Sequence, residues 1–487
     1  MSRPYFTRQH LTGAAVQAAL ALTVAAQLAG CAQPSEFKRL ALAVPQNWTA
    51  STPTVGSLDA AKTHWRAFFT DPRLQLLIGT ALEQNRDLRI AAARVQESRA
   101  QFGLVRAEQL PLVNLLGRGA IERSPASVSG VGGQSTGQRY DLTLSSVSFE
   151  VDFWGRLARL SDAARDSYLA TEESRRAVQL SLVADVATAY FNLLQFDDLV
   201  GLAHATVVSR ERSRALLIKG HELGAAQEYE VQQATGAVEA ARGNLAALAQ
   251  QRSVATNQIN FLIGQVPATL PPARPLEAQG LDAELSPGLP GEVLLARPDV
   301  MAAERRLIAA HANVDAARAA FFPKVLLTAG LGVAGLGLGS LFSGGAWAFQ
   351  PLLSLPLFDG GRSDANADVA AARKNIAVAE YEKTVQLAFR EASDQLSARV
   401  SLASQLRSAQ ANTSAQQRRL QIAQARFDAG TIGYLDVLDA QRDLVTAQQT
   451  FVQVRRAQLD AAAQLYKALG GGSQADFADN GKAVAQP

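Results

Sequence analysis

The residue with the clearest chemistry in this sequence is its single cysteine, Cys31. It follows Leu28-Ala29-Gly30, and the whole stretch from Leu11 to Leu28 carries no charge behind a basic start. A basic stretch, an apolar stretch and a small-residue cleavage site together make a secretory signal peptide. A buried structural cysteine is the alternative, but this spacing favours a cut between Gly30 and Cys31. We therefore expect a signal peptide over 1–30 and a thiol at the new N-terminus.

The string that ends at Cys31 also resembles a bacterial lipobox. That resemblance implies that Cys31 is lipidated, including with palmitate, and that the protein belongs to a Gram-negative bacterium. Ala32 follows, and a residue other than aspartate there implies sorting to the outer membrane. No other stretch offers ~20 consecutive strongly apolar residues, so we expect no further membrane helix.

Residue types that usually do catalysis are poorly arranged for it here. Four histidines remain after the cut, and they are scattered without metal-ligand spacing: His64, His204, His221 and His311. The Gly-rich stretch 330–345 lacks the Lys-Ser/Thr of a phosphate loop. The net charge of +3 over 487 residues gives no reason to expect a nucleic-acid partner. We expect no enzyme, no cofactor and no metal site.

A second set of charged residues follows a turn near the C-terminus. It consists of Leu435, Asp436, Asp439 and Arg442. Asp439 and Arg442 are three residues apart, so they share one helix face and can form an ion pair. For Asp439 alone, a solvated helix face is the competing interpretation.

The element that would carry these residues occurs twice in the chain. Leu110-Pro111 and Phe322-Pro323 lie 212 residues apart (323 − 111), and Gly155-Arg156 and Gly361-Arg362 lie 206 apart (361 − 155). The turns at Gly224 and Gly430 are also 206 apart (430 − 224). Matches in the same order at a nearly constant offset predict two copies of one unit.

Each copy reads as helix, two strands, long helix and helix. The expected domains are the signal peptide 1–30, an N-terminal lipid-anchored linker segment 31–72, the first repeat 73–270, an inter-repeat linker 271–297, the second repeat 298–470 and a flexible C-terminal tail 471–487. In the first repeat, Glu228 and Glu230 follow the turn at Gly224 and so occupy the place that the acidic residues after Gly430 occupy in the second.

The predicted helices are long. The stretches from 156 to about 223 and from 362 to about 428 contain no proline, and each would span ~100 Å as a continuous helix. We expect return helices at about 228–262 and 435–469. Opening helices at about 73–110 and 298–322 would stack end to end with them.

Four segments alternate between apolar and polar or small residues, as strands do. The clearest is 325–334; the second, over 142–151, changes phase and requires a bulge. Loops are expected at 123–140 and 336–345. Four strands of about ten residues cannot close a barrel around a lumen, so membrane-spanning strands would require several copies of the chain.

Four longer strings carry a family resemblance: 65–72 (WRAFFTDP), 149–156 (FEVDFWGR), 289–300 (LPGEVLLARPDV) and 355–362 (LPLFDGGR). With these the chain resembles the outer membrane factor family of TolC- and OprM-like channels, in its NodT-like efflux lipoprotein branch. The resemblance implies a mainly α fold with a transmembrane β-barrel portion, in which a homotrimer forms a channel-tunnel.

The same resemblance implies a function. The chain would be the outer-membrane channel of a tripartite efflux system, extending into the periplasm. Its partners would be a periplasmic adaptor (membrane fusion protein), an inner-membrane pump of the resistance-nodulation-division (RND) type, and outer-membrane lipid. Type I protein secretion, metal efflux and a lipid-anchored periplasmic scaffold are the alternatives.

The resemblance also assigns roles to residues. Gly224 and Gly430 would mark the tips that contact the adaptor. Leu435, Asp436, Asp439 and Arg442 would line a periplasmic gate. The equivalent carboxylates of the first repeat, Glu228 and Glu230, would form a secondary gate near the other tip.

Overall fold

The fold comes from a computed structural model of the chain. It describes residues 37–41, 44–45, 47–48, 58–124, 135–267, 269–281, 285–286 and 288–473. The signal peptide, Cys31 and most of the expected tail lie outside the described residues.

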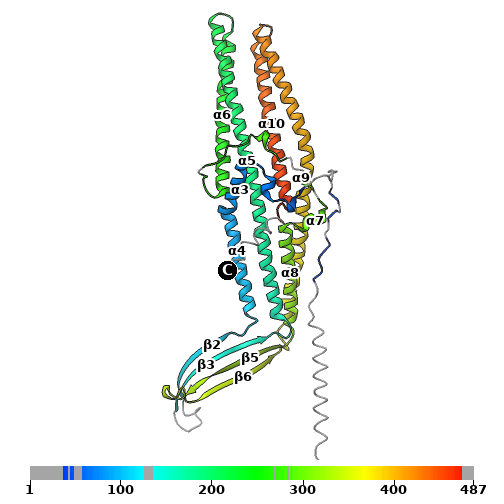
Figure 1. The fold of residues 1–487 in the computed structure, drawn as a ribbon. Helices are drawn as coiled ribbons and strands as arrows, with labels where there is room; N and C mark the ends of the chain where they lie inside the picture. Colours follow the sequence, from blue (N-terminus) through cyan, green and yellow to red (C-terminus); the bar gives the residue numbers. More distant parts are fainter. Residues whose placement is uncertain are drawn as a thin grey trace, which may run out of the picture. The chain divides into compact units, whose positions relative to one another are not determined.

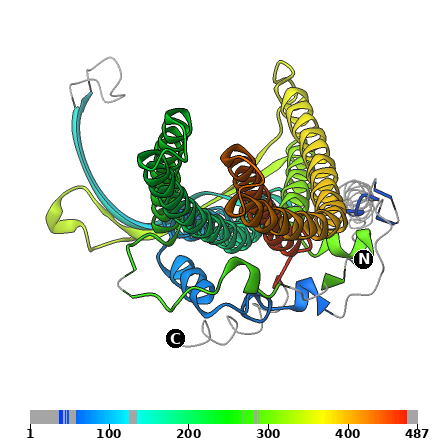
Figure 2. The ribbon, with the colours of Figure 1, turned by 90° about the horizontal axis from the view of Figure 1, so that it is seen from above.

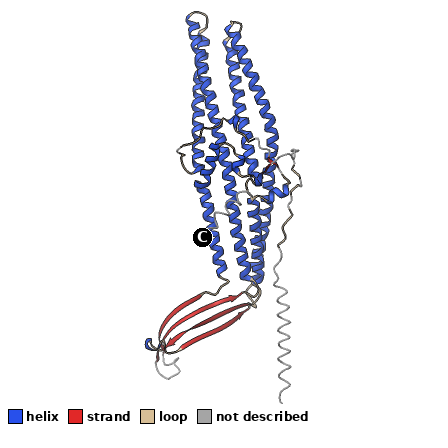
Figure 3. Ribbon diagram, viewed as in Figure 1, coloured by secondary structure: helices blue, strands red, loops and turns tan. Residues whose placement is uncertain are grey.

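The element order repeats along the chain, with helices and strands in the same succession (Figures 1 and 3). The first series is α3 (Pro72–Gln84), α4 (Arg86–Ala107), β2 (Val113–Ser124), β3 (Ser135–Val151), α5 (Arg156–Glu222) and α6 (Glu228–Ile263). The second is α7 (Pro290–Leu295), α8 (Pro298–Ala319), β5 (Lys324–Gly335), β6 (Gly345–Ser354), α9 (Arg362–Asp428) and α10 (Tyr434–Ala468). Short elements lie before and between them: β1 (Leu58–Asp59), η1 (Ala60–Lys62), α2 (Trp65–Phe68), η2 (Leu276–Ala278), β4 (Leu285–Ser286) and, in the β5–β6 loop, η3 (Leu338–Ser340).

The chain forms two compact units, and each unit takes segments from both series. One combines residues up to 40 with 96–171 and 303–380, and holds the four-stranded sheet. The other combines 41–95, 172–302 and the chain from 381 onward, and holds the two helical hairpins α5–α6 and α9–α10.

The first opening helix is not continuous, contrary to the prediction for 73–110. It divides at Asn85, whose extended ψ of 133° ends α3. The Asn85 Oδ1 atom accepts a hydrogen bond from the Leu88 backbone N at 2.9 Å and so begins α4. Its Nδ2 atom donates to the Leu262 carbonyl at 2.8 Å. One side chain thus connects three helix ends, where backbone groups lack partners within their own helices.

A similar junction joins α10 to α8. Arg297, just before α8, donates from Nη1 to the Ala468 carbonyl at the end of α10, at 3.0 Å. Asn85 and Arg297 are 212 residues apart (297 − 85), so equivalent positions serve equivalent junctions. The predicted end-to-end arrangement of return and opening helices is therefore confirmed at both places.

Aromatic side chains form the core of the hairpin-bearing unit. Phe68 stacks on Tyr466 with ring centroids 4.7 Å apart. The Tyr190 hydroxyl donates to the buried carboxylate of Asp71 at 2.8 Å, and Gln279 donates to the same oxygen at 2.7 Å. Burial, and then the bond to Asp71, raises the pKa of Tyr190. Asp71, which precedes Pro72, therefore caps the start of α3 and also binds α5 through Tyr190.

Helix α5 contains a segment that is long and apolar enough to cross a membrane, which the sequence analysis did not predict. Its mean hydropathy reaches 1.4 in that window, and half of the window is buried inside the protein. Buried α5 residues such as Val186, Tyr190 and Phe191 belong to the core described above. By length and hydropathy alone this segment would qualify as a membrane-spanning helix. In the structure it packs within the protein core.

The sheet-bearing unit holds strands in the order β2-β3-β5-β6, all antiparallel (Figure 1). The predicted bulge in the second strand is confirmed, because the β3·β5 register shifts between Ser146 and Phe149. Ser148 inside the bulge has φ +54°, and its backbone N donates to Thr328 Oγ1 at 3.0 Å. Strands β2 and β3 extend to Ser124 and from Ser135, into the predicted loop 123–140.

The strand-to-helix turns of this unit are tightly held. The Trp154 indole stacks on Phe322 at 4.9 Å, and its Nε1 donates to the Pro323 carbonyl at 2.8 Å. Arg156 forms a two-pronged ion pair with Glu150 at 2.8 Å. These contacts fix the start of α5 to the end of β3, as expected of a rigid junction.

Candidate functional site

The two hairpin turns have the same backbone geometry. Gly224 ends α5 with φ +71°, and Gly430 ends α9 with φ +68°. The next residue in each turn donates back five positions: Ala225 N to the Gly220 carbonyl at 2.7 Å and Thr431 N to the Arg426 carbonyl at 2.9 Å. This is the Schellman motif, in which a left-handed glycine ends the helix. The two predicted tips are therefore real turns; their contact with an adaptor stays a prediction.

The two hairpins lie side by side near these turns (Figures 1 and 2). A small cluster of buried residues joins them: Leu217 of α5, Ala234 of α6, and Tyr434 and Val437 of α10. The Tyr434 ring also lies 5.9 Å from that of Phe427. Burial of this apolar surface stabilises the paired hairpins.

The predicted gate residues occupy the first three turns of α10, on the face away from that cluster. Tyr434 and Val437 are buried, whereas Leu435 is 55 % exposed. Asp436 is exposed as well, and Asp439 is partly exposed. Arg442 Nη1 lies 3.3 Å from Asp439 Oδ1, so the predicted ion pair is confirmed. The role of these residues as a gate stays a prediction.

Two further charged residues extend this pair, and the sequence did not predict either of them. Asp443 Oδ1 lies 3.4 Å from Arg442 Nη2, and Asp443 Oδ2 accepts from Arg419 Nη1 of α9 at 2.5 Å. The Arg419 hydrogen bond, ahead of the charge of Arg442, holds the pKa of the Asp443 carboxyl below its usual value. Four charges therefore form one chain: Asp439, Arg442, Asp443 and Arg419. The contact of Asp443 with Arg442 could have been predicted, because the two residues are adjacent in the sequence. The contact of Arg419 with Asp443 could not, because it depends on how α9 packs against α10.

The two carboxylates of the first repeat have local partners. Glu228 Oε2 lies 3.3 Å from His221 Nε2 across the turn. Glu230 accepts a hydrogen bond from the Gln227 backbone N at 2.9 Å, which forms a capping box at the start of α6. The secondary-gate role of Glu228 and Glu230 stays a prediction.

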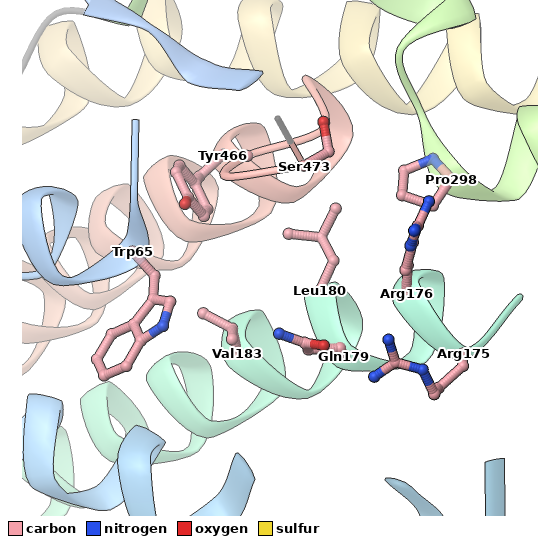
Figure 4. A pocket seen from close by; sticks show the side chains of 10 residues that line it. Trp65, Arg175, Arg176, Gln179, Leu180, Val183, Pro298, Tyr466 and Ser473 are labelled. Atoms are coloured by element: carbon pink, nitrogen blue, oxygen red, sulfur yellow. The ribbon is translucent and has the colours of Figure 1, made fainter. Parts of the chain in front are cut away.

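The same unit also contains a small cavity, away from the hairpin turns (Figure 4). Trp65, Val183 and Tyr466 line it on one side, and Arg175 and Arg176 on the other. Its volume of about 40 Å³ leaves room for only a few water molecules. It brings together no nucleophile and base, so it gives no support to a catalytic interpretation.

Comparison with known proteins shows to which protein family the chain belongs. The outer membrane efflux protein family matches residues 77–265 and 289–471, which together make up well over half of the chain. The chain belongs to this family. The two matched segments also follow the two series of helices and strands.

Individual relatives agree with the family. The chain is 41 % identical to the toluene efflux pump outer membrane protein TtgF of Pseudomonas putida, over 93 % of this chain and 96 % of that protein. It is 39 % identical to the cation efflux system protein CusC of Escherichia coli O6:H1, over 93 % and 98 % of the two chains. The open-state MtrE outer membrane channel of Neisseria gonorrhoeae matches with a TM-score of 0.84 and 34 % identity, covering 91 % of this chain and 99 % of that one.

These matches confirm the main predictions made from the sequence. The predicted fold class, a mainly α subunit of a trimeric channel-tunnel with a β-barrel portion and two tandem repeats, is confirmed. The chain is the outer-membrane channel of an efflux system and lies in the outer membrane, extending into the periplasm. Family members are channels, in keeping with the absence of catalytic motifs noted in the sequence.

Proposed function

We propose that this channel is a passive exit duct, closed at its periplasmic end by the first three turns of α10. The observation that carries the proposal is the chain of four charges, Asp439, Arg442, Asp443 and Arg419, which starts five residues into α10 and stays partly exposed. Leu435 and Asp436 lie on the same exposed side, one turn nearer the tip. The duct itself performs no enzymatic step.

Threefold symmetry gives these residues their effect. Each position occurs three times around the channel axis, so Asp436 and Asp439 would form rings of negative charge and Leu435 an apolar ring. A ring of carboxylates concentrates cations and disfavours anions. Exposed ion pairs such as Asp439–Arg442 contribute little to stability, which suits a closure that must open during each transport event.

The proposal includes the partners that the family resemblance implies. The turns at Gly224 and Gly430 would contact a periplasmic adaptor, with Glu228 and Glu230 beside the first of them. Energy would come from an inner-membrane pump of the resistance-nodulation-division type. Cys31 would carry lipid in the outer membrane, and the domain boundaries given above would hold for the mature chain.

The cargo would be small molecules. Similar proteins include one named for toluene efflux and one named for cation efflux, so organic molecules and metal ions are the two candidate classes. Susceptibility of a deletion strain, with and without the restored gene, to a panel of solvents, antibiotics and metal salts distinguishes them. Equal susceptibility to every compound would contradict the assignment to small-molecule efflux.

The gate is tested by conductance of the reconstituted trimer in a lipid bilayer. Asp439→Ala or Arg442→Ala removes one member of the ion pair and should raise the basal conductance several-fold. Gln424→Ala, on the neighbouring helix and outside the four-charge chain, is the control and should leave conductance unchanged. Unchanged conductance in both test variants would remove the gate assignment and leave the fold untouched.

A further inference from the structure

The two faces of the four-stranded sheet differ in polarity. On one face, a row across all four strands consists of large apolar residues: Leu115, Leu144, Leu331 and Trp347. All four are well exposed in the single chain, and Trp347 is 82 % exposed. In a membrane barrel a continuous apolar face contacts lipid, so the opposite face of the sheet lines the lumen.

The luminal face of the first hairpin, β2–β3, carries charged residues midway along its strands. Arg118 of β2 lies directly opposite Asp141 of β3. The Arg139 Nε atom, two residues away on the same face, donates to both oxygens of that carboxylate at 2.8 and 3.1 Å. The Asp141 side chain is 18 % exposed, whereas Arg118 is an exposed residue. Two guanidinium groups therefore stand beside one carboxylate.

The luminal face of the second hairpin, β5–β6, has small residues at the equivalent positions. Gly330 pairs with Ala348 where the first hairpin pairs Arg118 with Asp141. The offsets between the two pairs are 212 (330 − 118) and 207 (348 − 141). The strands β5 and β6 contain one charged residue, Lys324, at the first position of β5. Each chain therefore supplies one charged and one nearly uncharged wall segment to the lumen.

The charges at the level of Arg118 do not cancel. Arg139 neutralises Asp141, and Arg118 forms no ion pair with a carboxylate in the part of the chain that the structure describes. Glu122, the acidic residue of β2 on this face, lies four residues farther along the strand, which is ~14 Å. That distance exceeds the ~10 Å over which ~0.1 M salt screens a charge. Each chain thus adds one net positive charge at this level of the lumen.

The size of the barrel determines how far these side chains extend across its lumen. A barrel of about eight strands is filled by its side chains, whereas one of about sixteen leaves an aqueous channel. Three copies of the four-stranded sheet supply twelve strands (3 × 4), which lies between these sizes. Long arginine side chains therefore narrow such a lumen, and glycine and alanine leave it open.

We propose that Arg118, supported by the Arg139–Asp141 pair, forms a positively charged belt inside the membrane barrel that favours anionic cargo. These three residues, taken from all copies, are the charge belt. The proposal rests on the proposed function of the chain as a duct and adds a second selective level to it. Its sign is opposite to that of the predicted gate, where Asp436 and Asp439 would form negative rings. Since cargo must pass both levels, the belt limits the cation selectivity that the gate imposes.

Reversal potentials of the full-length trimer in a planar bilayer, under a KCl gradient, measure this selectivity. Arg118→Gln removes the charge and keeps most of the bulk, so the ratio of chloride to potassium permeability should fall roughly twofold or more at ~0.1 M salt. Arg118→Lys keeps the charge and should keep the ratio. The matched control is Arg123→Gln, on the same strand but eight residues from Leu115 and so on the lipid-facing side. It should leave the ratio unchanged.

A second variant makes the test independent of one substitution. Arg139→Gln frees the Asp141 carboxylate from its ion pair, so the net charge of the belt falls and the permeability ratio should fall in the same direction as for Arg118→Gln. Salt separates charge from shape, because the screening length is only ~3 Å at ~1 M salt. The differences between these variants and the unmodified protein should therefore largely disappear at high salt.

Three outcomes would overturn the charge belt. They are an unchanged permeability ratio in Arg118→Gln and Arg139→Gln at low salt, an equal fall in Arg123→Gln, and a fall that persists undiminished at ~1 M salt. Each of them leaves the proposed function intact, because the channel still conducts. A trimer of the unmodified protein that conducts no ions contradicts the proposed function instead.

Discussion

At the residue scale, the surroundings of Asp198 on α5 disfavour the charged form of its carboxylate. It lines a groove of about 490 Å³ together with Asp197 and Glu277. Burial first, and then the charges of Asp197 and Glu277, raises its pKa to about 6. Asp197 differs because Arg252 pairs with it.

The raised pKa of Asp198 makes folding stability depend on pH in a definite direction. An aspartate in the unfolded chain titrates near pH ~3.9. Between about pH 4 and pH 6 the unfolded chain therefore loses the Asp198 proton first, and folding stability falls as the pH rises through that window. The loss is complete above pH 6 and absent below pH 4.

We predict that Asp198→Asn stabilises the protein by about 1 kcal/mol at pH 7.5, a value reduced for the solvent screening of a half-buried group. Little gain is expected at pH 4. Denaturant unfolding of the detergent-solubilised protein at the two pH values measures it. Asp197→Asn is the comparison variant and should give a smaller gain, because it removes a charge that repels Asp198 but also breaks the pair with Arg252. An equal gain at both pH values would contradict the assignment to Asp198.

How far single residues could be predicted depends on whether their partners are local. Asp439 and Arg442 lie on one helix at a spacing that guarantees proximity, so their pairing followed from the sequence. Arg419 reaches Asp443 only because α9 and α10 pack in one particular register, and nothing in the sequence specified that register. The buried bond from Tyr190 to Asp71 spans 119 positions and was missed for the same reason.

At the scale of elements, the helix junctions carry the most concentrated polar contacts. Arg297 is 4 % exposed and binds Asp299 at 2.7 Å, Glu391 at 2.8 Å and the Ala468 carbonyl at 3.0 Å. Burial alone would lower its pKa, but the bonds to the two carboxylates outweigh it and raise the pKa. The guanidinium thus joins α8, α9 and α10.

We predict that Arg297→Leu destabilises the protein by about 3–5 kcal/mol, because it leaves two carboxylates and a carbonyl without their partner. Asn85→Ala at the equivalent junction should cost less, about 1–3 kcal/mol, since only neutral groups lose hydrogen bonds. Arg252→Leu removes a well-exposed arginine and serves as the control. Chemical unfolding of the three variants gives the order, and a smaller loss for Arg297→Leu than for Asn85→Ala would contradict this account.

Helices and strands were predicted best where one pattern of apolar residues continues without an interrupting proline or turn residue. The prediction of a helix from 362 to about 428 matches α9 (Arg362–Asp428), because no proline or turn residue interrupts it. The break at Asn85 was missed, since Asn is tolerated inside helices and its bond to Leu262 is a tertiary contact. Strand ends near the β2–β3 loop were also misplaced, because Ser and Gly there suit a strand tip as well as a loop.

At the scale of the whole molecule, duplication accounts for more than any single motif. It explains why equivalent residues serve equivalent helix ends. The clearest case is the pair of junctions at Asn85 and Arg297, which lie 212 residues apart (297 − 85) and each bind the carbonyl at the end of a return helix.

The last prediction concerns the lipid expected on Cys31. One acyl chain holds a protein in a membrane only marginally, whereas strands that span the bilayer bury far more apolar surface. We therefore predict that a Cys31→Ser variant, exported by a cleavable signal peptide without a lipobox, gives trimers of unchanged single-channel conductance but in reduced amount in the outer membrane. Membrane fractionation and bilayer recordings measure the two quantities separately. Ala32→Asp, which keeps the lipid and alters the sorting residue, should reduce the outer-membrane amount in the same way. Altered conductance per trimer in the Cys31→Ser variant would show that the lipid shapes the duct itself.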